Sequence, residues 1–126
     1  MKSKINLSRP FVDSRGVIQN ILNKNFGSFV IIESNKGSIR ANHYHKRHWH
    51  YCYILSGEIE YYSMHRKSNK IKVENFLTGD LFFTPPQVIH AMYFKKKTIF
   101  ATLGNRSRSH RSYENDLVRV TDFFKK

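Results

Sequence analysis

Short apolar segments, separated by turn residues, recur along most of the chain. They are rich in β-branched and aromatic residues, and several alternate apolar with polar positions, as half-buried strands do. Turn signals such as 56–57 and 78–80 bound them, and most intervals between turns are too short for helices. The pattern predicts a closed or two-sheet all-β fold in a single domain, residues 1–126. The expected strands cover residues 17–22, 28–32, 40–46, 51–55, 58–64, 71–74, 81–84, 88–94, 98–103 and 117–120.

The segment 51–55 is apolar at every position, so both of its faces are expected to be covered. A second copy of the chain would cover the outer face, which predicts a homodimer. A second layer of the same chain would explain the pattern equally well.

The chain is strongly basic. Its 22 lysines and arginines exceed its 9 acidic residues, which gives a net charge of +13. A basic surface favours anionic partners, such as a phosphorylated small molecule. No helix-turn-helix, zinc-finger or RNA-recognition signature is present, so we expect no nucleic-acid partner. Residues 95–97 are expected to form a hairpin tip, and basic residues cluster again at 106–111.

The apolar runs and the single cysteine bear on the cellular compartment of the protein. No apolar run approaches the roughly 20 residues of a membrane span, so no membrane association is expected. The chain starts without an apolar stretch of signal-peptide length. Cys52 is the single cysteine, which excludes an internal disulfide. These features together predict a cytoplasmic protein.

Histidines dominate the chemistry. Four of the seven lie between residues 43 and 50. On a strand, His43 and His45 would point to one face, and His50 and His90 could join them. Imidazole is a ligand for divalent transition metals such as zinc, iron, nickel or manganese. The cluster therefore predicts a metal site, and the sequence does not identify the metal. His48 is expected to point away toward the surface.

The spacings carry a resemblance to a family. H-x-H-x4-H-x6-G over residues 43–57 and G-x5-P-x4-H over residues 79–90 resemble the two motifs of the cupin superfamily. The resemblance implies a double-stranded β-helix, or jelly-roll barrel, that can hold a metal. His43, His45, His50 and His90 would be the ligands, with His50 where cupins usually carry a glutamate.

Three further segments resemble the RmlC-like cupins, the 3,5-epimerases and 3,4-ketoisomerases of dTDP-4-keto-6-deoxy sugars. They are F-V-D-S-R-G-V at 11–17, R-A-N-H-Y-H-K at 40–46 and Y-E-N-D-L-V-R at 113–119. The resemblance implies a usually dimeric isomerase or epimerase for surface-polysaccharide biosynthesis, acting on a nucleotide diphosphate sugar or another small anionic substrate. His43 or His45 would be the general base, and Arg40, Arg15 and Lys46 would hold phosphates.

Two departures keep other functions open. Ala41 stands where the family usually has glycine, and His50 stands where the ketoisomerases, which need no metal, typically have glutamine. A histidine that ligates a metal cannot also accept a proton, so the two mechanisms exclude each other. The alternatives are a metal-dependent cupin of another class, a dioxygenase or lyase, and a non-catalytic sugar-binding cupin.

Overall fold

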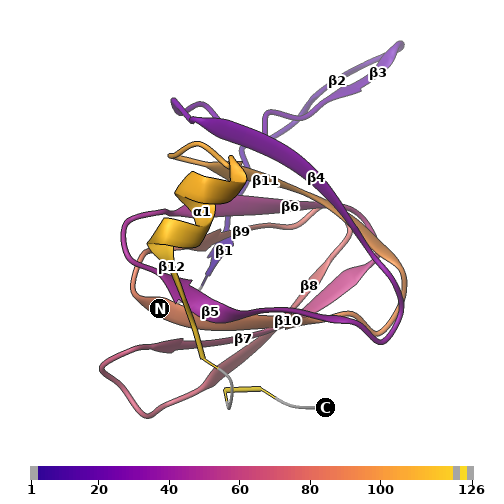
Figure 1. Cartoon of the computed structure of the whole chain (residues 1–126). Helices are drawn as coiled ribbons and strands as arrows, with labels where there is room; N and C mark the ends of the chain where they lie inside the picture. Colours follow the sequence, from indigo (N-terminus) through magenta and orange to yellow (C-terminus); the bar gives the residue numbers. More distant parts are fainter. Residues whose placement is uncertain (1–2, 121–122, 125–126) are drawn as a thin grey trace.

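The structure, a computed structural model, describes residues 3–120 and 123–124. Within this part, two five-stranded antiparallel sheets face each other and enclose the interior of a barrel (Figure 1). The first sheet has the order β1 (Lys4–Ile5), β9 (Leu81–Thr84), β6 (His50–Ser56), β11 (Thr98–Gly104), β4 (Ser28–Ser34). The second has the order β12 (Leu117–Arg119), β5 (Ile39–His45), β10 (Val88–Tyr93), β7 (Glu58–His65), β8 (Lys72–Leu77).

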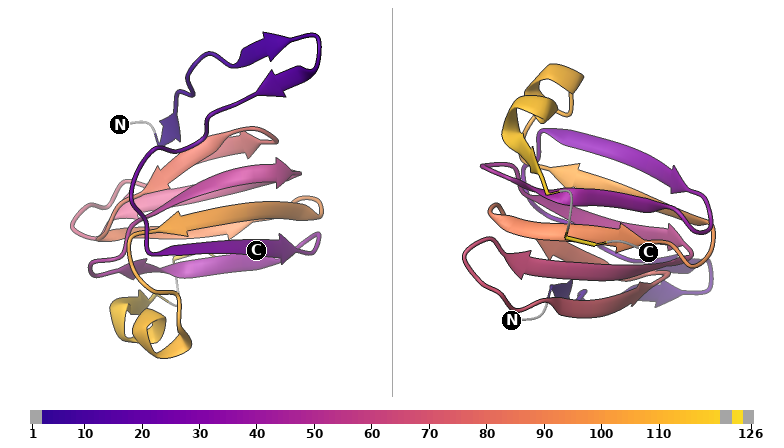
Figure 2. Two further views of the ribbon diagram at one scale, coloured as in Figure 1. Left: turned by 90° about the horizontal axis from the view of Figure 1, so that it is seen from above. Right: turned by 60° about the horizontal axis from the view of Figure 1, so that its bottom comes forward.

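The predicted all-β barrel is confirmed, with differences at the chain ends. A hairpin of β2 (Phe11–Asp13) and β3 (Gly16–Ile18) projects away from the barrel (Figures 1 and 2). The strand expected at 17–22 therefore ends early. One short helix, α1 (His110–Asp116), was not expected and stands at one end of the barrel between the sheets (Figure 1). In the described part of the chain, no helix is long and apolar enough to cross a membrane.

An apolar core fills part of the barrel interior. Alternation sends every second side chain of β7 inward, so Ile59 and Tyr61 are buried while their neighbours are half-buried. The rings of Phe76 and Phe82 stack with centroids 4.2 Å apart. Each large apolar side chain buried here contributes roughly 1.5–3 kcal/mol. The apolar core consists of Cys52, Ile54, Ile59, Tyr61, Phe76, Phe82, Met92, Phe94 and Phe100.

A β-bulge interrupts the pairing of β5 with β10. His90 lies opposite His43, but the next residue, Ala91, lies opposite Ala41, so Asn42 is the extra residue. Ala41 and Asn42 both adopt left-handed backbone conformations, with φ of 73° and 56°. Asparagine tolerates this region, whereas alanine is strained there. The bulge twists β5 immediately before the histidine that opens the cluster.

The outer face of β6 is covered in part by this chain itself. Tyr51 is buried against Trp49 and Phe83, and the Lys24 ammonium lies 5.9 Å from the centre of its ring. The same chain therefore provides the cover at Tyr51, as the second of the two explanations requires. Leu55, at the other end of the segment, remains 47% exposed.

Candidate functional site

The four histidines expected to converge do so inside the barrel. His43 and His45 come from β5, His50 begins β6, and His90 lies on β10. The His43 ring centroid is 4.7 Å from that of His45 and 4.8 Å from that of His90. The His50 centroid is 5.7 Å from His45 and 5.6 Å from His90. All four are buried, so the sheets place these rings together and away from bulk water.

The rings of His43, His50 and His90 border a small cavity, the histidine pocket, of about 150 Å³, whereas that of His45 does not line it. Strands of both sheets form its walls, and the segment leading into α1 borders it as well. Among the described residues, no aspartate or glutamate lines this pocket, although two arginines do. Its polar lining consists of Arg40, His43, His48, His50, His90, Thr102, Arg108 and Tyr113, and its apolar lining of Ile32, Ala41, Met92 and Phe100.

The expectation that His48 lies at the surface is wrong. Its side chain is only 4% exposed and its ring centroid lies 5.0 Å from that of His45. The turn after β5 folds the ring inward, over Gly104 of β11. A Cβ atom on Gly104 would collide with the His48 imidazole, so glycine leaves the room that the ring occupies. The buried cluster therefore contains five histidines rather than four, and His48 is one of those that line the pocket.

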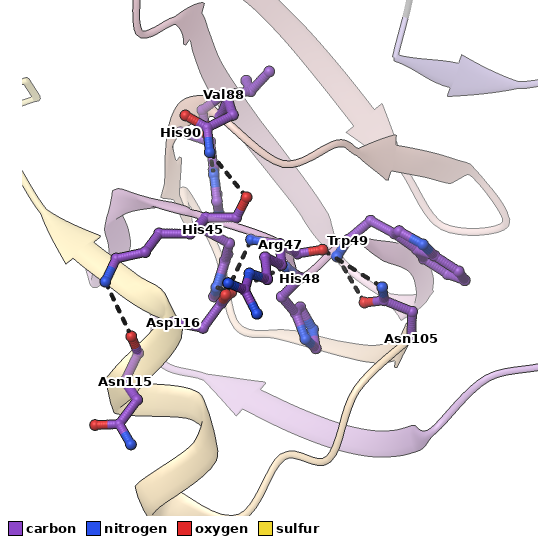
Figure 3. A network of polar contacts seen from close by, with 11 residues as sticks. His45, Arg47, His48, Trp49, Val88, His90, Asn105, Asn115 and Asp116 are labelled. Carbon is purple, nitrogen blue, oxygen red and sulfur yellow. Dashed lines mark hydrogen bonds and ion pairs between the residues drawn. The ribbon is translucent and has the colours of Figure 1, made fainter.

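Asp116 ties this turn to the end of α1 (Figure 3). Its Oδ1 accepts a hydrogen bond of 3.0 Å from the Arg47 main-chain N–H, and its Oδ2 accepts one of 3.0 Å from that of His48. Oδ2 also lies 3.3 Å from Nδ1 of His45, a charge contact without the alignment of a hydrogen bond. Asp116 therefore holds the turn, whereas the nearby Glu114 forms an ion pair with Arg119 at 2.8 Å.

The electrostatics of the pocket favour neutral imidazoles. Burial, followed by repulsion from the neighbouring histidines, lowers the pKa of His43 to about 2 and that of His45 to about 3. Burial lowers the pKa of His90 to about 4 and that of His50 well below its ordinary value. The Asp116 carboxylate acts in the opposite direction on the pKa of His45. Neutral imidazole is the form that binds a metal or accepts a proton.

The unpartnered ring nitrogens fit a metal ion. His43, His45 and His90 each offer a nitrogen, and these three atoms lie within 4.8 Å of one another. Nε2 of His45 and of His90 is buried without a hydrogen-bond partner among the described residues. Nδ1 of His90 lies 3.0 Å from the Val88 carbonyl oxygen, so a proton there would leave Nε2 free to ligate. Buried polar atoms normally have partners, so an ion would satisfy these.

The three expected phosphate-binding residues lie in three different places. Arg40 lines the histidine pocket, where its Nε donates a hydrogen bond of 2.6 Å to Ser34 Oγ. Arg15 lies in the β2–β3 hairpin, pairs with Asp13 at 2.6 Å and does not line the pocket of its own chain. Lys46 lies outside the pocket, with its Nζ 3.3 Å from the Asn115 carbonyl oxygen.

Sequence reasoning missed two residues of the pocket. The Arg108 guanidinium lies 3.6 Å from the centre of the Tyr113 ring, and both side chains line the pocket. The Tyr113 ring centroid is 5.2 Å from that of His45, and burial raises the pKa of its phenol. The basic cluster at 106–111 and the tyrosine of the 113–119 motif were the available signals, although neither indicated that these residues reach the histidines.

Comparison with known proteins identifies similar domains. The family model described as Cupin domain matches residues 29–103. No curated protein matches the chain. QdtA from Thermoanaerobacterium thermosaccharolyticum, a sugar 3,4-ketoisomerase solved in complex with TDP, superposes with a TM-score of 0.73 at 17% identity. The alignment covers 91% of this chain and 85% of QdtA.

Two further solved structures are similar. A dTDP sugar isomerase from Desulfovibrio desulfuricans gives a TM-score of 0.73 at 14% identity, over 91% of this chain and 80% of that one. The 3,5-epimerase RmlC from Legionella pneumophila, in complex with dTDP-4-keto-L-rhamnose, gives 0.70 at 14% identity, over 88% and 68%. At these identities the similarity shows the fold.

Proposed function

The chain belongs to the cupin domain family, and we propose that it isomerises or epimerises the sugar of a nucleotide diphosphate sugar in its histidine pocket. The observation that carries this proposal is the lining of the pocket. Neutral imidazoles lie beside the guanidinium groups of Arg40 and Arg108, with no carboxylate in the lining. Such a pocket suits an anionic substrate that must lose and regain a proton. The sugar isomerases and epimerases of the same fold support the assignment.

The size of the pocket divides the substrate into two parts. A cavity of about 150 Å³ suits a single sugar ring rather than a whole nucleotide sugar. We therefore infer that the sugar enters the cavity and that the nucleotide remains outside its mouth. Arg40, which is exposed on one side and lines the pocket on the other, is suited to hold the diphosphate.

Of the two candidate bases, His43 lines the pocket and His45 does not, but only His45 has a carboxylate partner, and we propose it as the base. A ketone acidifies the neighbouring C–H, and a base that takes this proton becomes a cation. Asp116, 3.3 Å from Nδ1 of His45, stabilises that cation, and no described carboxylate pairs with His43. Nε2 of His45 would accept the proton, since it is buried and unpartnered.

The proton transfers then balance. As His45 takes the carbon-bound proton, the carbonyl oxygen takes a proton from the Tyr113 phenol, and an enediol forms. Return of the proton from His45 to the former carbonyl carbon, with the other hydroxyl proton returning to Tyr113, moves the ketone by one position. If a water molecule instead protonates the original carbon on its opposite face, the former carbonyl oxygen returns its proton to Tyr113 and His45 gives its proton to the solvent, so the ketone stays in place and that carbon is inverted, which is epimerisation.

A second candidate is a metal-dependent cupin of another class, a dioxygenase or a lyase. The close, unpartnered nitrogens of His43, His45 and His90 favour it, with His50 beside them. These residues would hold zinc, iron, nickel or manganese, and the ion would supply Lewis-acid or redox chemistry. A histidine bound to the ion could not act as the base, so the two candidates exclude each other.

We also propose a homodimer. The β2–β3 hairpin exposes Phe11, Val12, Val17 and Ile18, each more than half exposed, and covers none of its own barrel (Figure 2). Edge strand β4 exposes Phe29 and Ile31. Contact between two copies would bury both surfaces. The dimer would act in a reducing cytoplasm, where the thiol of Cys52 would remain free.

Solvent exchange tests the proposed function. In D₂O, the protein should introduce deuterium beside the ketone of TDP-4-keto-6-deoxyglucose, as NMR would show. His45→Gln should slow this exchange by roughly 10²–10⁴-fold, the usual contribution of a general base. His65→Gln, a change at an exposed histidine on the same sheet, is the matched control. Arg40→Ala should weaken binding of the nucleotide sugar, more at low salt than at high salt.

Other results would select a rival. No binding of TDP-, UDP- or GDP-sugars, together with a tightly bound redox metal that consumes oxygen, would establish the dioxygenase. Phosphate-independent binding of free sugars without exchange would establish the non-catalytic sugar-binding cupin.

A further inference from the structure

A second hollow lies on the outer side of the segment that borders the histidine pocket. The segment 105–116, named the partition here, runs from the end of β11 through α1. Arg108 and Tyr113 of the partition line the histidine pocket, whereas Arg106 and Ser112 line the other hollow, of about 240 Å³. This outer hollow is completed by Lys46, Arg47, Asn115 and Asp116.

Three cations face this hollow from two separate parts of the chain. Lys46 and Arg47 come from the turn after β5, and Arg106 comes from the partition. Neither guanidinium makes an ion pair or a side-chain hydrogen bond within the described residues. The Lys46 ammonium contacts only a carbonyl oxygen of the partition, that of Asn115. Three like charges that line one hollow create a positive potential there, so the arrangement favours a negatively charged ligand.

The one carboxylate of the hollow does not provide that compensation. Asp116 is only 8% exposed, and its oxygens already face the main-chain N–H groups of Arg47 and His48 and the His45 ring. Its carboxylate lies beside His45 and the turn of Arg47 and His48, as Figure 3 shows. Within the described residues, neither the Arg47 nor the Arg106 guanidinium group pairs with a carboxylate. Three positive charges against one buried negative charge leave the hollow cationic.

The donors suit an oxyanion. A guanidinium group offers paired N–H donors that match two oxygens of a phosphate, and an ammonium adds a further charge. The Ser112 hydroxyl on the partition supplies a neutral donor. An anion that contacts Arg106 and Ser112 on one side and Lys46 and Arg47 on the other would join the partition to the barrel.

We propose that the outer hollow is a binding site for a phosphate-type oxyanion, which fastens the partition over the histidine pocket. The ligand is inorganic phosphate, pyrophosphate or the phosphate end of a nucleotide, which share the same chemistry. The site is separate from the sugar pocket and does not depend on the reaction proposed above. Its occupancy would hold Arg108 and Tyr113 in the pocket wall.

Pyrophosphate is the probe for this site, and the Arg40→Gln chain is the parent because it removes the arginine proposed to hold the diphosphate at the sugar pocket. By calorimetry, Arg106→Gln and Arg47→Gln should each weaken pyrophosphate binding to this parent by about tenfold, the value of one charge-assisted hydrogen bond. Arg111→Gln removes the same charge from an exposed residue of the partition outside both hollows, and should leave the affinity unchanged.

Hydrogen exchange gives a second readout. Pyrophosphate should slow amide exchange across 105–116 in the parent and should not do so after Arg106→Gln.

If the Arg106→Gln and Arg47→Gln chains bound pyrophosphate as tightly as the parent does, the proposed oxyanion site would be refuted. An equal loss in Arg111→Gln would also overturn it, because it would show a general charge effect. TDP that competes with pyrophosphate for the hollow identifies a nucleotide as the source of the phosphate, and TDP that does not compete identifies a free oxyanion. If pyrophosphate bound as expected but no deuterium entered the sugar, only the proposed function would be refuted.

Discussion

The interior of the barrel is filled differently in its two halves. One half is the apolar core, where Phe76, Phe82 and their neighbours pack ring against ring. The other half is the histidine pocket, where equally buried side chains leave ring nitrogens without partners. The same strands supply both halves: β6 contributes His50 to the pocket and Ile54 to the core.

The difference indicates what each half does. Burial of apolar rings stabilises the fold, while burial of an unpaired polar group costs about 1–3 kcal/mol. The core therefore supports a pocket that by itself opposes folding. We expect the two halves to respond in opposite ways to truncation, protons and metal.

Truncation in the core should have the largest effect. Phe82 is fully buried and contacts both Phe76 and Tyr61. Phe82→Ala removes the ring and leaves a cavity, so the free energy of unfolding should fall by about 3–5 kcal/mol. Denaturant unfolding measures the loss. Phe26→Ala, at a phenylalanine that is 47% exposed, should change it by less than about 1 kcal/mol, and equal losses would contradict the comparison.

Acid should destabilise the pocket half. The pKa of His90 is about 4 in the folded protein and about 6.5 when unfolded, so below pH 6.5 the unfolded chain takes up protons that the pocket excludes. His90 alone should therefore cost about 3 kcal/mol of stability between pH 6.5 and pH 4, and this stability is fully present above pH 6.5. Unfolding curves across this range measure the loss.

The control for the acid effect is His90→Phe, which retains a ring but cannot be protonated. Its stability should depend less steeply on pH than that of the original chain. Parallel pH dependence of the two chains would show that His90 does not contribute, and that the other buried histidines and the carboxylates account for the acid response.

Metal binding should change the contribution of the histidine pocket to stability from unfavourable to favourable. If zinc binds the folded pocket, free zinc at 100 times its dissociation constant should add about 2.7 kcal/mol to the stability. Thermal unfolding with and without zinc measures the shift. His45→Ala should abolish it and His65→Gln should retain it, while a melting temperature of the original chain that stays unchanged with zinc, iron, nickel and manganese alike would remove the metal-dependent candidate.

Substitution of Asp116, which connects the pocket to α1, should have the smallest effect on stability. Asp116→Asn retains one oxygen acceptor for two main-chain donors, so stability should fall by about 1–2 kcal/mol. Glu114→Gln, in the neighbouring exposed ion pair with Arg119, should cost less than about 1 kcal/mol. If the two variants lost equal stability in denaturant, Asp116 would be no more than a surface charge.

The strand pattern and the convergence of His43, His45, His50 and His90 could be predicted from the sequence. Alternation with period two identifies which side chains of β7 face inward, and the i, i+2 spacing places His43 and His45 on one face. The spacing of His50 and His90 gave the remaining positions because the resemblance supplied a barrel in which they meet. Local pattern and motif were sufficient for these features.

The rest of the site depends on contacts between distant segments. His48 is buried because a turn held by Asp116, 68 residues later, folds it over Gly104. No local pattern predicts such a turn. Arg108 and Tyr113 reach the pocket only because α1 stands at the end of the barrel, and seven-residue helices give little periodic signal. Arg15 follows the family motif, but its hairpin leaves the barrel of its own chain.

The pairing of β5 with β10 also bears on the order of events during folding. These strands are neighbours in the sheet but are separated by about 40 residues of chain, and such non-local pairing is slow to form. We therefore expect His90 to join the other histidines late, and a metal that binds this cluster could already bind the stretch from His43 to His50 in the unfolded chain. Such a metal, if present during refolding, would stabilise the unfolded chain. The same metal added after folding would bind the completed pocket.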